Sequence, residues 1–192
     1  MTSISQANEM ELVTRAQSGD RNAFSELVRA HAQGVLHVIY RMCGDMGVAE
    51  DAAQETFIQA WLRLPSYRPR ASLRNWLYRI AVNSAIDMLR KEKRILPGAV
   101  EDLRLTDPQP GPEALAANSE QAETVQEAVL ALPDASRAVL VLREYEGLSY
   151  QAIAESLDIP VGTVMSRLNY ARKLLKENLE VQLFSYAEAG NV

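Results

Sequence analysis

Apolar residues recur at intervals of three and four along most of the chain, which is the spacing of one buried face of an α-helix. Before residue 95, this pattern predicts helical segments around residues 12–16, 23–28, 35–44 and 48–64 and a long helix over residues 73–94. Asp20 and Ser72 are suited to cap two of these helices, because their side chains can accept hydrogen bonds from free N–H groups. No alternating strand pattern or Asn-Gly hairpin turn intrudes, so the sequence predicts an all-α fold.

Residues 96–122 differ in character from the segments on either side. They contain four prolines and two glycines, and most of their charged residues are acidic. Such a segment cannot bury a core, so we expect a flexible acidic linker there. We therefore expect a helical domain at residues 1–95, the linker at residues 96–122, a second helical domain at residues 123–180 and a short tail at residues 181–192.

The second predicted domain contains the pattern of a helix-turn-helix between Gly147 and Leu175. Ser149 can cap the first helix, and the segment from Asp158 to Pro160 interrupts the pattern before the second helix begins. The second helix has an apolar stripe on one side and a stripe of hydrogen-bonding residues on the other. Such a face can enter the major groove of DNA, where Arg and Lys contact phosphates and shorter polar groups contact base edges. An ordinary helical hairpin with a solvated basic face is the alternative.

The net charge of −5 is unevenly distributed along the chain. Residues 63–94 hold nine cations and two anions, so nearly half of the 20 Lys and Arg residues lie in this window. On the long predicted helix, Trp76 shares one side with Arg79 and Asn83. Aromatic rings that stack on bases, together with cations that follow the backbone, are typical of surfaces that bind single-stranded nucleic acid. A tryptophan that closes the edge of the core is the alternative.

The composition gives no sign of catalysis or of a membrane segment. No apolar run reaches the length of a membrane span and the N-terminus lacks a signal-peptide pattern, so we expect a cytoplasmic protein. His31 and His37 cannot share a helix face, and the single cysteine, Cys43, offers no metal pair or internal disulfide. Phosphate-binding loops and nucleophile motifs are missing as well. We therefore expect no enzyme activity, no metal and no cofactor.

Two segments resemble a known family. The runs AEDAAQETF and WLYRIAVN are similar to the second conserved region of bacterial extracytoplasmic-function (ECF) sigma factors. The run GLSYQAIA, followed by PVGTVMSRL, is similar to their fourth region. The resemblance implies two small helical domains, without catalytic activity, that bind core RNA polymerase and read the −10 and −35 elements of promoter DNA.

Carried over by position, the resemblance implies a role for three groups of residues. Contact with the coiled coil of the polymerase β′ clamp is expected at Asp51, Gln54, Glu55 and Ile58. Binding of the opened −10 strand and capture of an extruded base are expected at Tyr67, Arg68, Arg70, Ser72, Trp76, Arg79 and Asn83. Contact with the −35 duplex is expected at Arg143, Thr163, Ser166, Arg167, Asn169, Tyr170 and Lys173.

The resemblance also implies further partners. Members of the family are usually stress-responsive and held inactive by a cognate anti-sigma factor, and their linker threads through the polymerase channel, next to the β subunit. The alternative function is a stand-alone helix-turn-helix regulator that binds duplex operators. That alternative leaves the basic window, Trp76 and the first domain without a role.

Overall fold

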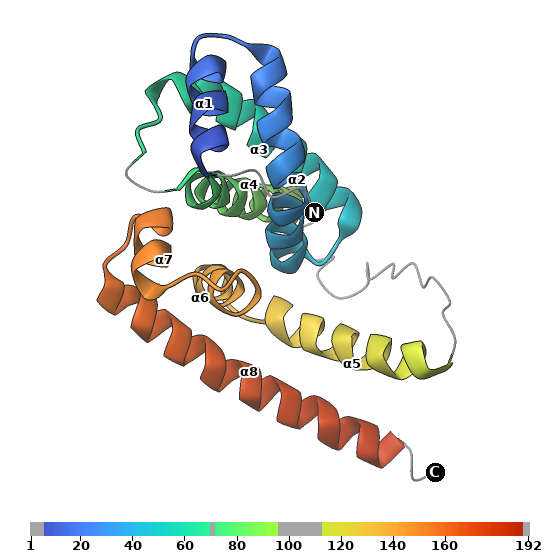
Figure 1. Ribbon diagram of the computed structural model, residues 1–192. Helices are drawn as coiled ribbons and strands as arrows, with labels where there is room; N and C mark the ends of the chain where they lie inside the picture. Colours follow the sequence, from blue (N-terminus) through green and yellow to red (C-terminus); the bar gives the residue numbers. More distant parts are fainter. Residues whose placement is uncertain (1–5, 70–71, 96–112, 190–192) are drawn as a thin grey trace.

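The computed structural model describes residues 6–69, 72–95 and 113–189, and every regular element within these ranges is helical, which confirms the predicted all-α fold. The first half of the chain contains α1 (Gln6–Gln17), α2 (Arg21–Cys43), α3 (Met46–Arg63), the 3₁₀ turn η1 (Leu64–Ser66) and α4 (Leu73–Ile95). The second half contains α5 (Glu113–Leu130), α6 (Asp134–Leu140), the π-helical turn η2 (Val141–Tyr145), α7 (Tyr150–Leu157) and α8 (Val161–Ala189). Figure 1 shows the two halves one above the other.

α2 is one continuous helix, whereas the apolar pattern predicted two segments. As predicted, Asp20 caps its N-terminus, here by accepting hydrogen bonds from the second and third N–H groups, and Gly44 ends it in the left-handed conformation with φ of 79°. The predicted interruption between residues 28 and 35 does not occur, and α4 packs directly on Gly34 in this stretch. A Cβ atom at Gly34 would lie 2.7 Å from the hydroxyl oxygen of Tyr78. Gly34 therefore allows α2 and α4 to approach closely and does not form a turn.

Polar contacts attach α1 to the rest of the first half. The Arg15 guanidinium lies 2.7 Å from the Asp20 carboxylate and lowers the pKa of that carboxyl group. The side-chain amide of Gln17 donates to the carbonyl oxygens of Leu64 and Tyr67, each at 3.0 Å. These two bonds fix η1 and the start of the loop that leads into α4.

The core of the first half lies among α1, α2, α3 and α4. Its largest contributions come from buried residues at the helical spacing that the sequence predicted, including Leu12, Leu27, Val35, Val38, Ile39, Met42, Ala60, Leu64, Leu77 and Ile80. Full burial of one Leu, Ile or Val side chain is worth about 1.5–3 kcal/mol. The same burial fixes the rotation of α4 about its axis, which leaves Arg79 and Asn83 on the exposed side.

The second half begins earlier than the sequence predicted. α5 starts at Glu113, so residues 113–122, which we expected in the linker, are helical, and residues 96–112 lie outside the described residues. The physical reason is local: Pro112 precedes a run rich in Ala, Glu and Gln, and these residues favour a helix while Glu113 suits its positive N-terminal end. α5 ends at Leu130, and a short turn leads to the start of α6 at Asp134.

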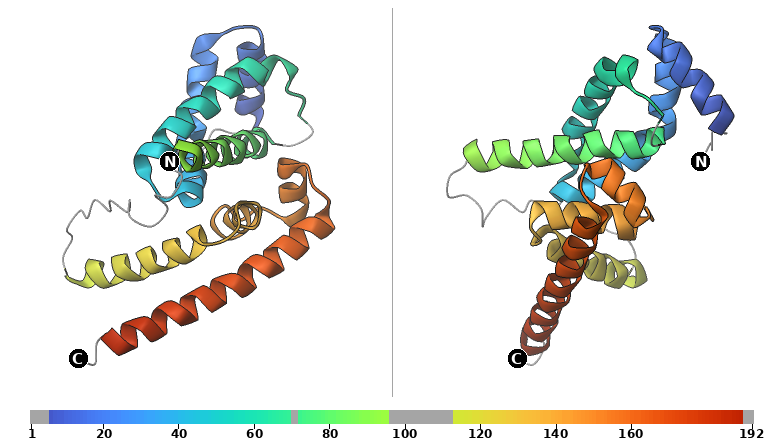
Figure 2. Two further views of the ribbon diagram at one scale, coloured as in Figure 1. Left: turned by 180° about the vertical axis from the view of Figure 1, so that it is seen from behind. Right: turned by 90° about the vertical axis from the view of Figure 1, so that its left-hand side faces the viewer.

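The two halves pack against each other. α4 lies against α7, and the C-terminal part of α2 lies against α5, α6 and η2, as the views in Figures 1 and 2 show. One set of buried apolar residues extends through both halves. The basic helix α4 therefore lies next to the helix-turn-helix, although the two are far apart in the sequence.

Candidate nucleic-acid and polymerase interface

The helix-turn-helix forms as its capping residues predicted. Ser149 accepts a hydrogen bond from the N–H of Ala152 at 3.1 Å, which caps α7. Asp158 ends α7 in the left-handed conformation with φ of 56°, and Asp tolerates this conformation better than most residues. Ile153 of α7 and Leu168 of α8 belong to the same buried cluster, so the two helices are fixed at a definite angle.

The recognition helix α8 presents a polar face with two exposed apolar side chains. Ser166, Asn169, Tyr170 and Lys173 are exposed, whereas Thr163 and Arg167 are half-buried. Met165 is 48% exposed and Tyr170 is 52% exposed. Met165 therefore lies on the exposed part of α8, next to Ser166. An apolar group here is able to contact a thymine methyl in the major groove.

Arg143 does not lie on this exposed face. Its guanidinium donates to the carbonyl oxygen of Leu148 at 2.8 Å and lies 5.1 Å from the centre of the Tyr150 ring. The side chain is half-buried and holds the η2–α7 turn. Its position therefore fits a role in orienting the helix-turn-helix better than the direct DNA contact that the family resemblance implied.

The α4 surface combines basic, amide and aromatic side chains. Ser72 begins the helix by accepting a hydrogen bond from the N–H of Asn75 at 3.2 Å, as predicted. Arg79 and Asn83 are exposed, whereas Trp76 is half-buried. The three predicted residues thus lie on the same stretch of α4, but they differ in how far their side chains are exposed to solvent.

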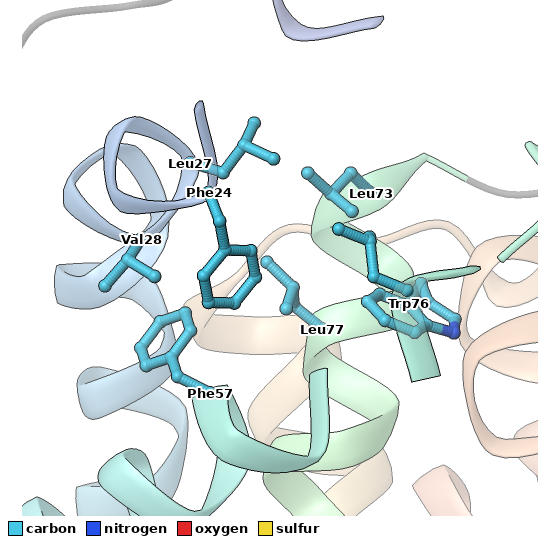
Figure 3. Close-up of a pocket in the computed structure, with 8 residues that line it drawn as sticks. Phe24, Leu27, Val28, Phe57, Leu73, Trp76 and Leu77 are labelled. Carbon is cyan, nitrogen blue, oxygen red and sulfur yellow. The ribbon is translucent and has the colours of Figure 1, made fainter. Parts of the chain in front are cut away.

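Trp76 also closes the edge of the core. Figure 3 shows its ring beside a small pocket lined by apolar side chains, among them Phe24, Leu27, Val28, Phe57, Leu73 and Leu77. Its ring centre lies 5.0 Å from that of Tyr67. The sequence left two roles open for Trp76, closing the edge of the core or contacting nucleic acid, and the half-buried ring is consistent with both.

The loop before α4 is less accessible than we expected. Tyr67 is only 5% exposed, because its ring packs beside that of Trp76, and burial raises the pKa of its phenol. Its expected contact with the −10 strand stays a prediction. Arg68 is exposed and donates to the carbonyl oxygens of Pro65 and Tyr67. Arg70 lies outside the described residues.

The outer face of α3 joins acidic and apolar side chains. Asp51, Gln54 and Glu55 are exposed, as predicted, and Ile58 is 54% exposed. Leu62, one helical turn after Ile58, is 66% exposed and was missed, although the spacing of four would have indicated it. An exposed apolar pair beside acidic groups is typical of a protein contact rather than of a DNA contact.

Residues 6–69, 72–95 and 113–189 contain no group of three His, Cys, Asp or Glu side chains that could hold a metal ion. Within the same ranges, no helix is long and apolar enough to cross a membrane.

Comparison with known proteins covers both halves of the chain. The sigma-70 region 2 family matches residues 27–95, and the sigma-70 region 4 family matches residues 122–175. RNA polymerase sigma-H factor of Pseudomonas aeruginosa is 36% identical over 186 residues, which cover 92% of this chain and 96% of that protein. ECF RNA polymerase sigma factor SigW of Bacillus subtilis is 35% identical over 179 residues, covering 87% of this chain and 94% of that protein.

Solved structures have the same fold. The structure of CnrH in complex with the cytosolic domain of CnrY matches with a TM-score of 0.68 and 27% identity, over 91% of this chain and 98% of that one. The sigma factor RpoE of Bartonella quintana, solved with the anti-sigma factor NepR, matches with a TM-score of 0.64 and 24% identity, over 82% of this chain and 97% of that one. With both sigma-70 regions present in order and relatives matched over nearly their whole length, the chain belongs to the ECF family of RNA polymerase sigma factors.

Proposed function

We propose that this sigma factor binds core RNA polymerase through α3, the opened −10 strand through α4 and the −35 duplex through α8. The observation that carries the proposal is the presence, in one chain, of a basic helix with an aromatic residue and of a formed helix-turn-helix. The alternative of a stand-alone regulator is wrong, because both sigma-70 regions match and the ECF relatives align with the whole chain. A transcription initiation factor of this kind is not itself an enzyme.

The α3 face is suited to a protein partner. Asp51 and Glu55 supply negative charge, and Ile58 and Leu62 supply apolar area that is exposed in the free chain. Apolar anchors surrounded by charged groups are the usual arrangement of a protein interface. We assign the contact with the β′ clamp coiled coil to this face.

The α4 surface is suited to a single strand. Arg79 can follow the phosphates, Asn83 can hydrogen-bond a base edge, and the accessible part of Trp76 can stack on a base. Duplex DNA hides base faces, so these side chains contact a base only after the strand has opened. We assign the −10 contact to Arg68, Trp76, Arg79 and Asn83, with Ser72 and Tyr67 as supporting residues.

The α8 face is suited to a duplex. Ser166, Asn169, Tyr170 and Lys173 are exposed on α8 and Arg167 is half-buried there. We assign contacts with base edges to the first three and to Arg167, and a contact with phosphate to Lys173. Because Arg143 is held inside the second half, we assign to it the positioning of the turn.

The family also suggests a protein regulator. The Bartonella quintana relative was solved with an anti-sigma factor, and we propose that a protein of this class binds the present chain.

Transcription with purified components tests the proposal. We expect the chain to direct initiation from a promoter only when core RNA polymerase is present, which separates a sigma factor from an operator-binding protein. Asp51→Lys/Glu55→Lys should weaken binding to core polymerase at least about tenfold while leaving helicity unchanged. Glu11→Lys/Glu26→Lys makes the same charge change at exposed positions of α1 and α2 and is the matched control. Equal binding by both variants would contradict the α3 assignment.

A further inference from the structure

The side-chain amide of Gln17 joins α1 to the turn that precedes α4. Its nitrogen donates to the carbonyl oxygen of Leu64 and to that of Tyr67, each at 3.0 Å. Gln17 is the last residue of α1, whereas the two acceptors lie 47 and 50 residues further along the chain, at the two ends of η1. One half-buried side chain therefore fixes both ends of the same turn.

Other hydrogen bonds of this turn are local. The N–H of Tyr67 donates to the Leu64 carbonyl oxygen at 3.0 Å, and the guanidinium of Arg68 donates to the Tyr67 carbonyl oxygen at 3.0 Å. Such bonds shape the turn, but they do not set its place on the helices around it. The bonds from Gln17 do, because they start from a separate element and hydrogen bonds depend on direction, unlike apolar packing.

α1 is itself a firm support. Its inner side is buried in the core through Leu12, Val13 and Ala16. A carboxylate oxygen of Glu9 lies 2.8 Å from Nε2 of His31 on α2, and both side chains are largely buried. Burial and, to a smaller extent, the charge of Glu9 raise the pKa of the Tyr67 phenol. α1 thus lies close to the ring of Tyr67 as well as to its backbone.

The ring of Tyr67 in turn supports Trp76. The two ring centres are 5.0 Å apart, with an angle of 48° between the planes. Tyr67 is buried and Trp76 is half-buried, so Tyr67 lies on the protein side of the pair and part of the tryptophan ring stays accessible. A ring whose direction is already fixed loses less freedom when it binds a ligand. The direction of the Trp76 ring therefore depends on the position of the turn.

We propose that Gln17 is a positioning residue for −10 binding: it holds the turn so that Tyr67 keeps Trp76 in the direction that stacks on an unpaired base. The inference rests on the proposed role of α4 in binding the −10 strand. It gives a part in promoter opening to α1, which precedes the residues that match sigma-70 region 2. Gln17 acts through the turn and not on the DNA, since its amide is occupied by the two carbonyl oxygens.

A positioning role differs from a purely structural one in its effect on stability. Gln17→Leu removes both bonds and keeps a side chain of similar size. The Leu64 and Tyr67 carbonyl oxygens each keep a local donor, so the free energy of unfolding should change little. The turn, however, becomes free to shift against α1. Fewer molecules then have the Trp76 ring in the direction that binds a base, and the apparent affinity for the open strand falls.

Holoenzyme binding to a partly opened promoter tests the proposal. The probe is a fluorescein-labelled fragment of a promoter that the wild-type holoenzyme selects from a random library. Its −35 element is duplex and its −10 element is single-stranded, and a second probe carries the −35 duplex alone. Anisotropy gives the Kd for each probe, and urea denaturation gives the stability of each chain. Gln33→Leu is the matched control, since it makes the same replacement at an exposed position of α2.

We expect Gln17→Leu to weaken binding to the partly opened probe about three- to tenfold. Its binding to the −35 duplex and its urea midpoint should stay close to those of Gln33→Leu. Equal binding of the partly opened probe by the two variants would overturn the proposal. So would a urea midpoint that falls in step with the binding, because Gln17 would then have a structural role only.

A double-mutant cycle with Trp76 shows whether Gln17 acts through this ring. Trp76→Leu keeps an apolar side chain at the edge of the core but cannot stack on a base. In that background we expect Gln17→Leu to weaken binding by less than about twofold, because the stacking contact is already lost. A loss as large as in the wild-type background would overturn the proposal. Wild-type binding by Trp76→Leu alone would instead overturn the proposed −10 contact of α4, and this inference with it.

Discussion

The guanidinium of Arg137 in α6 donates a hydrogen bond to the carbonyl oxygen of Met42, at the C-terminal end of α2, over a distance of 2.5 Å. The same guanidinium donates to the carbonyl oxygens of Leu130 and Leu132, at 2.5 and 2.8 Å. A charged side chain of the second half thus caps a helix of the first half and closes the α5–α6 turn. Arg137 is only 6% exposed, and burial lowers its pKa.

We expect Arg137→Leu to lower the free energy of unfolding by about 2–4 kcal/mol. The leucine leaves three carbonyl oxygens without a donor in a region that excludes water. Urea denaturation followed by circular dichroism measures the loss. Arg172→Leu is the control: its partner Glu144 lies 2.7 Å away, but both side chains are about half exposed, so we expect a change below about 0.5 kcal/mol. Equal losses in the two variants would contradict the role given to Arg137.

Local features of this fold were predictable and long-range ones were not. The Asp20 and Ser149 caps, and the left-handed residue at Asp158, depend on neighbours within four residues, so the sequence contains the whole signal. The apolar stripe of α8 was predictable for the same reason. The continuity of α2 was not predicted, and the close packing of Tyr78 on Gly34, which explains the glycine in this helix, joins residues far apart in the sequence.

In the candidate site, too, local features were predictable from the sequence and features that depend on long-range packing were not. Exposure of Asp51, Glu55 and Asn83 followed from helical spacing. Burial of Tyr67 did not, because it depends on Gln17 holding the η1 turn and on Trp76 covering the ring. The contact between the Arg79 guanidinium and the Asp158 carboxylate, at 3.0 Å, joins residues far apart in the sequence, and no periodicity indicates such a pair.

The buried Tyr78 predicts a loss of stability at alkaline pH. Burial, together with the hydrogen bond and charge of Glu146, raises the pKa of the Tyr78 phenol well above its ordinary value of 10.0. A group whose pKa is raised on folding contributes stability that is present below its ordinary pKa and is lost as the pH rises above it. We therefore expect the free energy of unfolding to fall above pH 10.0 in the wild type. Urea midpoints over a series of pH values measure this fall.

Tyr78→Phe identifies the group responsible. This variant keeps the ring that packs on Gly34 but removes the hydroxyl, so we expect a loss of about 1–2 kcal/mol at neutral pH and a shallower fall above pH 10.0. Tyr170→Phe, at an exposed position, should keep the wild-type pH dependence. A Tyr78→Phe chain with the wild-type alkaline slope would show that another group is responsible.

Promoter opening should depend on Asn83 and Trp76 in different ways. Both side chains are accessible from the same side of α4, and contacts to an unstacked base are worth ~1–3 kcal/mol. We expect Asn83→Ala to reduce open-complex formation without changing stability, because the side chain is exposed. Trp76→Ala should reduce both, because its ring also covers Tyr67. Permanganate footprints of the −10 region report opening, and urea denaturation reports stability.

Asn22→Ala is the control for these two variants, since it removes an exposed amide from α2. Binding to a −35 duplex should remain unchanged in all three chains. Footprints that stay at the wild-type level in both α4 variants would contradict the −10 assignment.

The recognition helix should separate base readout from phosphate binding. Arg167 is half-buried between the exposed Ser166 and Asn169, and a guanidinium can make a bidentate contact to a base. Lys173 is 74% exposed at its side chain and has a loose pairing with Glu177 at 3.9 Å. We expect Arg167→Ala to relax the preference at particular −35 positions, with a loss of about 1–3 kcal/mol for the preferred base. Lys173→Ala should weaken binding to all DNA sequences alike and reduce the salt dependence of binding by about one released counterion.

Selection from promoter libraries with each holoenzyme, repeated at several salt concentrations, measures both effects. If the selected −35 sequences were the same for wild type and Arg167→Ala, the guanidinium would not read a base, and the half-buried arginine would have a structural role instead.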